Sequence, residues 1–283
     1  MVILSGRAKL AGVMGWPVGH SRSPRLHGFW LEHYKVDGAY VPLAVAPERL
    51  GEALRALPTF GFRGINLTLP HKEAALVHVG ALSETARRIG AVNTIVVDGD
   101  GGLRGDNTDA FGFIENLRVS VPRWRGEARP VAVLGAGGAA RAVIVALLDA
   151  GVTEVRLLNR SMERAEKLRE AFGSMITVTA WEKRSDALID TGLVVNTTSL
   201  GMTGQPPLDL TLDRLPAEAV VYDLVYDPLC TLLLNNARRR GNPVVDGLGM
   251  LLHQARPGFR AWFGVEPEVT PALRAFVLED LKG

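Results

Sequence analysis

A glycine-rich turn at residues 135–140 has a composition suited to binding the pyrophosphate of a dinucleotide. It reads Gly-Ala-Gly-Gly-Ala-Ala and fits the G-x-G-x-x-G/A fingerprint, with Ala140 in the third place. Gly135 permits a tight turn, Gly137 has no side chain to hold a phosphate away, and a helix N-terminus offers unpaired N–H groups to the phosphates. An ordinary strand-to-helix connection can have the same composition, so the flanking elements must decide.

These flanking elements favour cofactor binding. Residues 131–134 form an apolar run typical of a buried parallel strand, and an apolar helical pattern follows through Leu148. Gly151 ends that helix, and a second apolar run at 155–158 predicts the next strand. Strand, turn, helix and strand are the context that the fingerprint requires. We therefore expect the turn to hold a dinucleotide through Gly135, Ala136, Gly137, Gly138 and Ala139.

The end of the second strand indicates which dinucleotide is bound. An NAD site places an Asp or Glu about 20 residues past the fingerprint, where it binds the ribose 2′-hydroxyl. Here the chain has Asn159, Arg160 and Ser161, and Arg164 follows about one helical turn later. A planar guanidinium suits a 2′-phosphate, so the sequence predicts NADP rather than NAD. The alternative explanation is that both arginines are solvated charges at a helix end.

Two serines precede a predicted helix near the N-terminus. The strand expected at 10–14 is followed by a loop that contains Ser21 and Ser23, and Pro24 begins a helix that extends to residue 34. Two hydroxyls at a helix N-terminus could bind a carboxylate. From the loop alone, the preferred interpretation is that Ser23 caps the helix.

A lysine and an aspartate have the chemistry for proton transfer. Lys72 lies in the first turn of a helix that begins at Pro70, where a cation is unfavourable, and such exceptions are typical of functional residues. A lysine extended into solvent would explain the pattern equally well. Asp109 opens another helix, for which Asp106 or Thr108 could be the N-cap. Asp109 would then be a spare carboxylate near the carboxyl ends of the first strands, where α/β sheets bind ligands.

The predicted elements indicate an α/β fold with two domains. The expected strands lie at 10–14, 40–45, 61–67, 90–97, 131–134, 155–158, 194–198 and 220–226, with another near Val244. One mononucleotide-binding half does not need the two C-terminal helices to cover the faces of its sheet. We therefore expect these helices to complete the first domain. Residues 1–109 with 247–283 would then form an α/β substrate-binding and catalytic domain, and residues 110–246 a Rossmann-type NADP-binding domain.

The composition of the 283 residues excludes several other classes of protein. A hydrophobic content of 47%, a charged content of 22% and a net charge of +2 are typical of globular proteins and give no electrostatic case for nucleic acid. Three glycines and Arg141 interrupt the apolar segment 131–148, so no membrane span is expected. No secretory signal is evident, and a single cysteine, Cys230, agrees with a reducing, cytoplasmic compartment. The six histidines lack metal-ligand spacing, so we expect no metal site.

Seven motifs in order give the chain a close resemblance to the shikimate dehydrogenase family over nearly its whole length. They are SRSP (21–24), NLTLPHK (66–72), GAVNT (90–94), GDNTD (105–109), GAGGA (135–139), NR (159–160) and DGLGM (246–250). The resemblance implies reversible, NADPH-dependent reduction of 3-dehydroshikimate to shikimate, a small-molecule substrate on the pathway to chorismate and the aromatic amino acids. It adds no macromolecular partner, and a monomer or a homodimer is expected.

The resemblance also implies roles for individual residues. Lys72 and Asp109 would be the catalytic pair. The residues that would bind substrate are Ser21, Ser23, Thr68, Asn93, Tyr226 and Gln254. Glu84, Leu224 and Gly247 would line the cofactor, together with the glycine-rich turn and residues 159–161 and 164. The chain departs from the family in small ways, since Ser161 stands where the family often has Thr, and Leu224 where some members have Met.

Three alternatives remain open on the sequence alone. A close one is a dehydrogenase that prefers quinate or also uses NAD. A sensor that binds the same ligands without catalysis is less consistent with the sequence, because it would need no proton donor such as Lys72. A folate-type dehydrogenase shares the two-domain plan, but two serines and Gln254 suit a small hydroxylated acid better.

Overall fold

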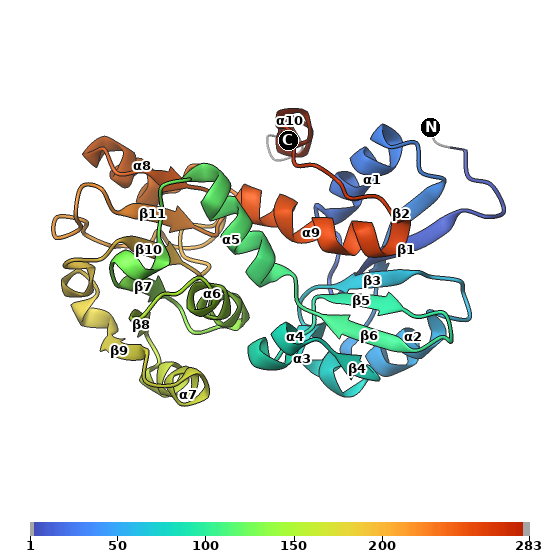
Figure 1. Cartoon of the computed structure of the whole chain (residues 1–283), viewed down its shortest axis with the longest axis horizontal. Coiled ribbons are helices and arrows are strands. Elements are labelled where there is room, and N and C mark those ends of the chain that lie inside the picture. Colours follow the sequence, from blue (N-terminus) through green and yellow to red (C-terminus); the bar gives the residue numbers. More distant parts are fainter. Residues whose placement is uncertain (1–2, 280–283) are drawn as a thin grey trace. The chain divides into compact units, whose positions relative to one another are not determined.

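The computed structural model describes residues 3–279 of the chain and divides it into two compact α/β units (Figure 1). Unit 1 comprises residues 1–109 and 252–283, and unit 2 comprises residues 110–251. The second boundary falls inside helix α9 (Gly247–Phe263), whereas the division made from the sequence places it at residue 247. Each unit contains its own six-stranded sheet.

Unit 1 is built on a mixed sheet with the strand order β2-β1-β3-β5-β6-β4. Its strands are β1 (Lys9–Gly15), β2 (Gly38–Ala44), β3 (Gly64–Leu67), β4 (Ala81–Leu82), β5 (Thr94–Val97) and β6 (Leu103–Asp106). Strand β1 is parallel to β2 and β3, whereas β5 is antiparallel to both β3 and β6. The ends of β1, β3 and β6 and the beginning of β5 therefore lie at one edge of the sheet.

The helices of unit 1 enclose two groups of apolar side chains. The helices are α1 (Ser23–His33), α2 (Leu50–Ala56), α3 (His71–Ala74), α4 (Glu84–Ile89), the later part of α9, and α10 (Pro271–Glu279). One group surrounds Leu54 of α2 and Ile65 of β3, which are both fully buried. Burying an aliphatic side chain of this size stabilises a fold by about 1.5–3 kcal/mol.

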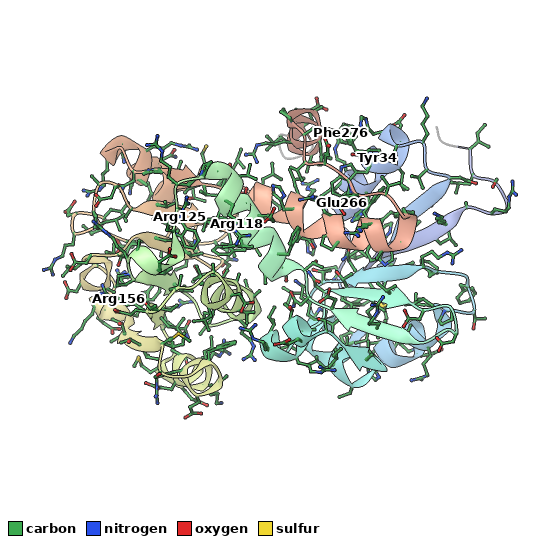
Figure 2. All side chains as sticks on the ribbon, viewed as in Figure 1. Tyr34, Arg118, Arg125, Arg156, Glu266 and Phe276 are labelled. Atoms are coloured by element: carbon green, nitrogen blue, oxygen red, sulfur yellow. The ribbon has the colours of Figure 1, made fainter. Side chains whose placement is uncertain are left out.

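The second apolar group in unit 1 is aromatic and joins the C-terminal helices to α1. Trp30 of α1 and Phe259 of α9 are fully or almost fully buried, with ring centroids 5.2 Å apart. Tyr34 and Phe276 lie near these helices (Figure 2). The Tyr34 hydroxyl accepts from the Glu268 N–H at 3.0 Å, and the Arg25 guanidinium lies 4.0 Å from the centre of the Phe276 ring. Trp30 and Phe259, more than 200 residues apart in the sequence, thus share one core.

Unit 2 is built on an all-parallel sheet with the order β12-β11-β10-β7-β8-β9. Its strands are β7 (Val131–Leu134), β8 (Val155–Asn159), β9 (Ile176–Ala180), β10 (Leu193–Asn196), β11 (Val220–Asp223) and β12 (Val244–Val245). Counted from β7, this is the 3-2-1-4-5-6 order of dinucleotide-binding folds. The predicted α/β class with a Rossmann-type unit is therefore confirmed.

The helices of unit 2 and one irregular segment cover the sheet. The helices are α5 (Asp109–Ser120, of which Asp109 belongs to unit 1), α6 (Gly138–Asp149), α7 (Met162–Phe172), α8 (Leu232–Arg240) and the first residues of α9. Between β10 and β11 no helix forms. There Leu208, Leu210, Leu212 and Leu215 are buried against the sheet instead. Strands β7 and β10 are buried along their whole length, which explains their continuous apolar sequences.

Several strands are shorter than the sequence patterns predict, and the lost residues lie near polar groups. Strand β5 begins at Thr94 rather than residue 90, and β11 ends at Asp223 rather than residue 226. After β11, the Val225 N–H donates to the Asp223 carboxylate at 3.1 Å and not to a neighbouring strand. A side chain thus replaces the backbone ladder after β11, whereas before β5 the N–H groups of Ala91 and Val92 donate to the carbonyl oxygens of Ala86 and Lys72, outside the strands.

None of the helices within residues 3–279 combines the length and the apolar character that crossing a lipid bilayer requires.

Candidate active site

Lys72 and Asp109 form an ion pair at the edge of the unit 1 sheet. Lys72 Nζ lies 2.6 Å from Asp109 Oδ2, and the two side chains keep 29% and 15% of their accessible surface. Lys72 follows β3 on α3, and Asp109 follows β6 as the first residue of α5. Since an ammonium has three N–H donors, two remain for another molecule when one is bound to Asp109. The pair combines a proton donor, a carboxylate partner and access to solvent.

Asn93 and Gln254 lie beside this pair. The Asn93 side-chain amide donates to Asp109 Oδ1 at 2.8 Å, so each carboxylate oxygen of Asp109 has one partner. The same amide lies 3.4 Å from Gln254 Oε1, which the Thr108 hydroxyl also contacts at 3.4 Å. Asn93 and Gln254 are both almost fully buried. Four residues that the sequence singled out therefore lie together in unit 1.

The loop between β6 and α5 is held by its own side chains. Asn107 donates to the Ala91 carbonyl oxygen at 3.0 Å and accepts from the Asp109 N–H at 3.0 Å. Of the two N-cap candidates, Asp106 does not cap the helix, because its Oδ1 accepts from the Ser83 hydroxyl and the Asn107 N–H instead, whereas Thr108 directly precedes the first helical residue, Asp109. The carboxylate of Asp109 thereby remains available to Lys72.

The local argument for Lys72 needs correction, although Lys72 does follow Pro70 at the start of a helix. Helix α3 contains only residues 71–74, so Lys72 lies within one turn of both its ends. The helix dipole therefore neither favours nor disfavours the charge of Lys72. Its position is explained by Asp109. The neighbouring His71 is buried, and burial lowers its pKa, partly opposed by the contact of Nε2 with the Val45 carbonyl oxygen.

Ser23 does not cap helix α1. It is the first residue of the helix, Arg22 occupies the N-cap position, and no side chain caps that end. The Ser21 hydroxyl accepts from the Ser23 N–H at 3.3 Å, and the Ser23 hydroxyl bonds to that of Tyr40. Ser21 and Ser23 follow β1, and Thr68 follows β3, so all three come from the sheet edge that carries Lys72.

The glycine-rich turn in unit 2 has the geometry that its sequence predicts. Gly135 has φ +110°, and a Cβ there would lie 2.6 Å from Thr197 Oγ1, so only glycine fits without strain. Gly137 is the N-cap of α6 and makes no side-chain cap, and a Cβ on Gly137 or Gly138 would meet open space. The start of α6 therefore has no side-chain cap and has open space at both glycines, as close approach of a phosphate requires.

Two arginines near the end of β8 are exposed. Asn159 ends the strand and donates to the Ser161 carbonyl oxygen at 2.9 Å, while the Ser161 hydroxyl caps α7 by accepting from the Arg164 N–H at 3.4 Å. Within residues 3–279, the Arg160 side chain has no hydrogen bond or ion pair. An unpaired guanidinium and the lack of a carboxylate at the strand end fit a ribose 2′-phosphate.

The remaining predicted residues are distributed over both units. Glu84 is the exposed first residue of α4 in unit 1, whereas Leu224, Tyr226 and Gly247 belong to unit 2. A Cβ on Gly247 would lie 2.0 Å from the Leu224 carbonyl oxygen, so glycine permits α9 to begin against the segment after β11. No group of three or more His, Cys, Asp and Glu residues within the described part of the chain could hold a metal ion.

Sequence reasoning missed several buried polar residues that contact the site. Thr94 and Thr108 both contact the Asn93 side chain, and Asn66 contacts Thr94. In unit 2, a similar group surrounds the buried Asp223. The available signal was a polar residue that interrupts or ends an apolar strand pattern, as Asn66 and Thr94 do.

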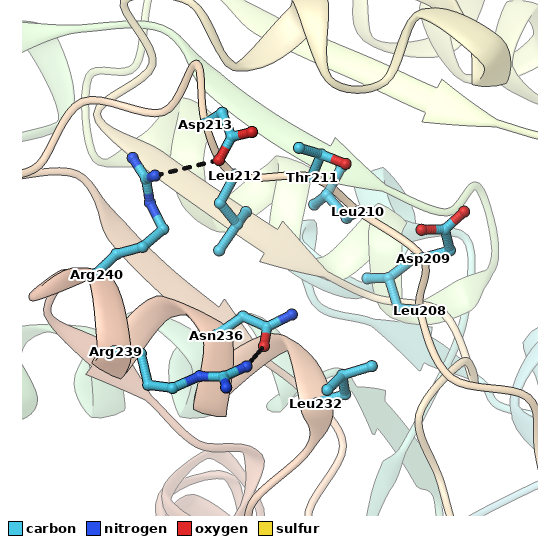
Figure 3. Close-up of a pocket in the computed structure, with 10 residues that line it drawn as sticks. All are labelled: Leu208, Asp209, Leu210, Thr211, Leu212, Asp213, Leu232, Asn236, Arg239 and Arg240. Carbon is cyan, nitrogen blue, oxygen red and sulfur yellow. Dashed lines mark hydrogen bonds and ion pairs between the residues drawn. The ribbon is translucent and has the colours of Figure 1, made fainter.

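Two cavities lie away from these residues. One of about 400 Å³ in unit 2 is lined by residues 208–213 and by Leu232, Asn236, Arg239 and Arg240 of α8 (Figure 3). The other, of about 340 Å³, is in unit 1 and includes Lys9, Arg63 and Trp262. Neither contains a residue predicted to bind substrate or cofactor.

The fold and the ion pair together define a two-unit α/β oxidoreductase with a Rossmann-type unit. Three family descriptions match successive parts of the chain: a shikimate dehydrogenase substrate binding domain at residues 13–95, a shikimate/quinate 5-dehydrogenase at 123–202 and a shikimate 5′-dehydrogenase C-terminal domain at 247–275. The chain belongs to the shikimate dehydrogenase family.

Individual relatives agree with this assignment. A shikimate dehydrogenase (NADP(+)) of Paramagnetospirillum magneticum is 62% identical over 97% of this chain and 100% of its own length. The crystal structure of a shikimate 5-dehydrogenase from Thermus thermophilus in complex with NADP(H) and shikimate is 39% identical, with a TM-score of 0.83 and coverage of 97% and 98%. A quinate dehydrogenase from Corynebacterium glutamicum in complex with NAD is 31% identical, with a TM-score of 0.88 and coverage of 96% and 99%.

Proposed function

We propose that this chain catalyses the reversible, NADPH-dependent reduction of 3-dehydroshikimate to shikimate. The observation that carries the proposal is the Lys72–Asp109 ion pair, with Asn93 and Gln254 beside it. A protein that only bound these ligands would need no proton donor there. The relative that is 62% identical is itself a shikimate dehydrogenase (NADP(+)), which supports the same reaction.

Lys72 would be the proton donor in the direction of reduction. NADPH, when bound, would supply the hydride for the carbonyl carbon of the substrate. Negative charge then grows on the carbonyl oxygen, and the ammonium of Lys72 can stabilise that charge and donate a proton to it. Asp109 holds the ammonium in place through the 2.6 Å contact and would accept a hydrogen bond from a neighbouring hydroxyl of the ring. In the oxidative direction, neutral Lys72 would take the proton back.

The substrate would be held by neutral groups. We assign its carboxylate to the hydroxyls of Ser21 and Ser23, with charge-assisted hydrogen bonds of about 1.5–3 kcal/mol each. Thr68, Asn93 and Gln254 offer hydroxyl and amide groups that suit the ring hydroxyls. Tyr226 of unit 2 remains a further candidate for the substrate.

NADP would be held mainly by unit 2. The uncapped start of α6 would bind the pyrophosphate, and the exposed Arg160 and Arg164 would bind the 2′-phosphate. Asn159 and Ser161 would hold the segment that presents these arginines. Further proposed contacts with the cofactor come from Glu84, Leu224 and Gly247.

A second candidate is oxidation of quinate with NAD. The similarity to the quinate dehydrogenase from Corynebacterium glutamicum in complex with NAD supports it. Against it, β8 ends at Asn159, Arg160 follows directly, and neither residue has a carboxylate to bind an unphosphorylated ribose. We therefore favour shikimate and NADP.

Initial rates with shikimate or quinate, each with NADP⁺ or NAD⁺, test the proposal through the absorbance of the reduced nicotinamide. The expected result is the highest kcat/KM with shikimate and NADP⁺. A purified protein that does not reduce NADP⁺ in the presence of shikimate would contradict the proposal. A higher kcat/KM with quinate and NAD⁺ would establish the second candidate instead.

We also propose a cytoplasmic enzyme that is a monomer or a homodimer. Its nicotinamide cofactor and its single exposed cysteine, Cys230, support a reducing compartment. Cell fractionation tests the location, and sedimentation of the purified chain at several concentrations tests the oligomeric state.

A further inference from the structure

A chain of buried hydrogen bonds runs through unit 1 from Tyr40 to the carboxylate of Asp109. The Tyr40 hydroxyl donates to Asn66 Oδ1 at 2.6 Å, and Asn66 Nδ2 donates to Thr94 Oγ1 at 3.1 Å. Thr94 in turn donates to Asn93 Oδ1 at 2.9 Å, and Asn93 Nδ2 donates to Asp109 Oδ1. From Tyr40 to Asn93, each residue keeps less than a tenth of its surface exposed.

The direction of each hydrogen bond in this chain is fixed by its neighbours. Asn66 Nδ2 also lies 3.0 Å from the Asn93 backbone carbonyl oxygen, which can only accept. The amide of Asn66 must therefore place its nitrogen there and its oxygen toward Tyr40. Both protons of Asn66 Nδ2 are then used, and Thr94 receives one of them. The single proton of the Thr94 hydroxyl then has two possible acceptors, Asn93 Oδ1 at 2.9 Å and Thr108 Oγ1 at 3.3 Å, and the shorter contact assigns it to Asn93.

Thr94 also determines what the neighbouring Thr108 can do. The Thr108 hydroxyl has one proton and three acceptors within reach: Asn93 Oδ1 at 3.2 Å, Thr94 Oγ1 at 3.3 Å and Gln254 Oε1 at 3.4 Å. Because Thr94 and the Thr108 N–H already donate to Asn93 Oδ1, the proton of the Thr108 hydroxyl is available to Gln254. Without the Thr94 hydroxyl, Asn93 and Gln254 would compete for that proton.

We propose that Thr94 is a positioning residue for the reaction, which orients the side chains of Asn93 and Gln254 and, through Asn93, the Lys72–Asp109 pair. Asn66 and Tyr40 are the outer members of the same network and hold Thr94 in its donating orientation. Thr94 itself touches neither Lys72 nor Asp109, so its effect passes through Asn93. The inference rests on the proposed function, because the groups it orients are those assigned to substrate and proton transfer.

The test compares Thr94→Val with Thr94→Ser in the oxidation of shikimate. Valine keeps the shape of threonine and removes the donor, whereas serine keeps the donor. We expect Thr94→Val to lower kcat/KM for shikimate by about tenfold, the effect of one lost buried hydrogen bond, with the KM for NADP⁺ unchanged. Thr94→Ser should restore kcat/KM to within about twofold of the unmodified enzyme.

Thr191→Val in unit 2 is a matched control. Thr191 is also fully buried, and its hydroxyl makes one hydrogen bond, to the Ala187 carbonyl oxygen at 2.9 Å. Its replacement removes the same group from a place outside the site, so the kinetics should not change. Tyr40→Phe tests the far end of the network, and we expect kcat/KM for shikimate to fall about twofold to fivefold.

The outcomes separate the two proposals. An unmodified enzyme without shikimate activity would overturn the proposed function, and the positioning role with it. An active enzyme in which Thr94→Val matches the unmodified kinetics would overturn the positioning role alone. A Thr94→Ser variant as impaired as Thr94→Val would show that the hydroxyl is not the cause. If Thr94→Val does not fold, unchanged kinetics in Tyr40→Phe would equally reject the network.

Discussion

Each unit contains an asparagine that is held by a threonine and donates to an aspartate. In unit 1, Asn93 Oδ1 accepts from the N–H of Thr108 at 2.8 Å and from the hydroxyl of Thr94 at 2.9 Å, and Nδ2 donates to Asp109. In unit 2, Asn196 Oδ1 accepts from the N–H of Thr198 at 3.0 Å and from its hydroxyl at 2.7 Å, and Nδ2 donates to Asp223 at 2.9 Å. Both groups lie at strand ends, with the same hydrogen-bond pattern around the amide.

The two aspartates differ in their other partners and in their burial. Asp109 pairs with Lys72 and remains partly exposed. Asp223 is fully buried and is held by neutral donors, namely the hydroxyl of Thr231 at 2.6 Å and the Val225 N–H, besides Asn196. Burial raises the pKa of Asp223, while these hydrogen bonds act in the opposite direction.

The difference indicates which features the proposed catalytic role of Asp109 requires and a structural carboxylate lacks. Asp223 fixes the segment after β11 through the Val225 N–H; it has no exposed surface, and within residues 3–279 no cation forms an ion pair with it. Asp109, in contrast, pairs with the ammonium of Lys72 and is partly exposed to solvent. The following substitutions test this distinction in order of the expected effect.

Lys72→Met should lower kcat by about 100-fold or more, because it removes the proton donor. Lys167→Met is a matched control, since Lys167 forms an ion pair of the same 2.6 Å length with Glu163 on the exposed face of α7. Steady-state kinetics with shikimate and NADP⁺ measure both. An unchanged turnover number in Lys72→Met would remove Lys72 from the mechanism.

Arg160→Ala should raise the KM for NADPH by about tenfold or more, with little change in the KM for 3-dehydroshikimate. The reason is the loss of charge-assisted hydrogen bonds to the 2′-phosphate, at about 1.5–3 kcal/mol each. Arg169→Ala, which breaks an exposed ion pair with Glu166 on the same helix, is the control. Equal values of the KM for NADPH in Arg160→Ala and in the unmodified enzyme would reject the assignment of NADP to unit 2.

Asp223→Ala should change stability and not the chemical step. It leaves buried donors of Asn196 and Thr231 without an acceptor, and each unsatisfied group costs about 1–3 kcal/mol of unfolding free energy. Chemical denaturation measures that loss, and single-turnover rates at saturating ligand concentrations should remain within about threefold. A loss of single-turnover rate as large as that in Lys72→Met would break the distinction between the two aspartates.

Substitution of His27 is expected to have the smallest effect. His27 is a buried titratable side chain without a hydrogen-bond partner. It is fully buried, neither ring nitrogen has a hydrogen-bond partner, and burial lowers its pKa to about 3. The folded state therefore keeps His27 neutral, while the unfolded chain binds a proton near pH 6.5. This stability is fully present above pH 6.5 and is lost as the pH falls toward 3.

Between pH 7.5 and pH 5.5, His27 should account for a loss of about 1.4 kcal/mol in unfolding free energy. The loss in His27→Phe over this interval should be smaller by that amount, as measured by denaturant titration at both values. Identical losses in the variant and the unmodified chain would show that His27 is not held neutral.

The sequence was most informative where the chain obeys simple periodicity. The βαβ frame around the glycine-rich turn was predicted because buried parallel strands are continuously apolar and Gly135 marks a turn that only glycine fits. In unit 1, motifs identified Lys72, Asn93 and Asp109, but only the sheet register shows that the ends of β3 and β6 and the beginning of β5 share one edge.

Local rules failed where distant side chains decide the geometry. Ser23 satisfies the rule for an N-cap, yet it begins the helix and its hydroxyl contacts Tyr40. Lys72 was singled out because a cation is unfavourable at a helix N-terminus, but α3 is a single turn and has only a small dipole. Thr94 was missed because its hydrogen bond with Asn66 depends on the antiparallel pairing of β5 with β3, which has no local signature.

The most direct test of the account is a double-mutant cycle on the single-turnover rate, with Lys72→Met, Asp109→Asn and the double variant. Because the two side chains are bound to each other and act on one proton transfer, the double variant should be about as slow as the slower single variant. If the two losses multiplied instead, Lys72 and Asp109 would act independently, and the ion pair would not be the catalytic unit.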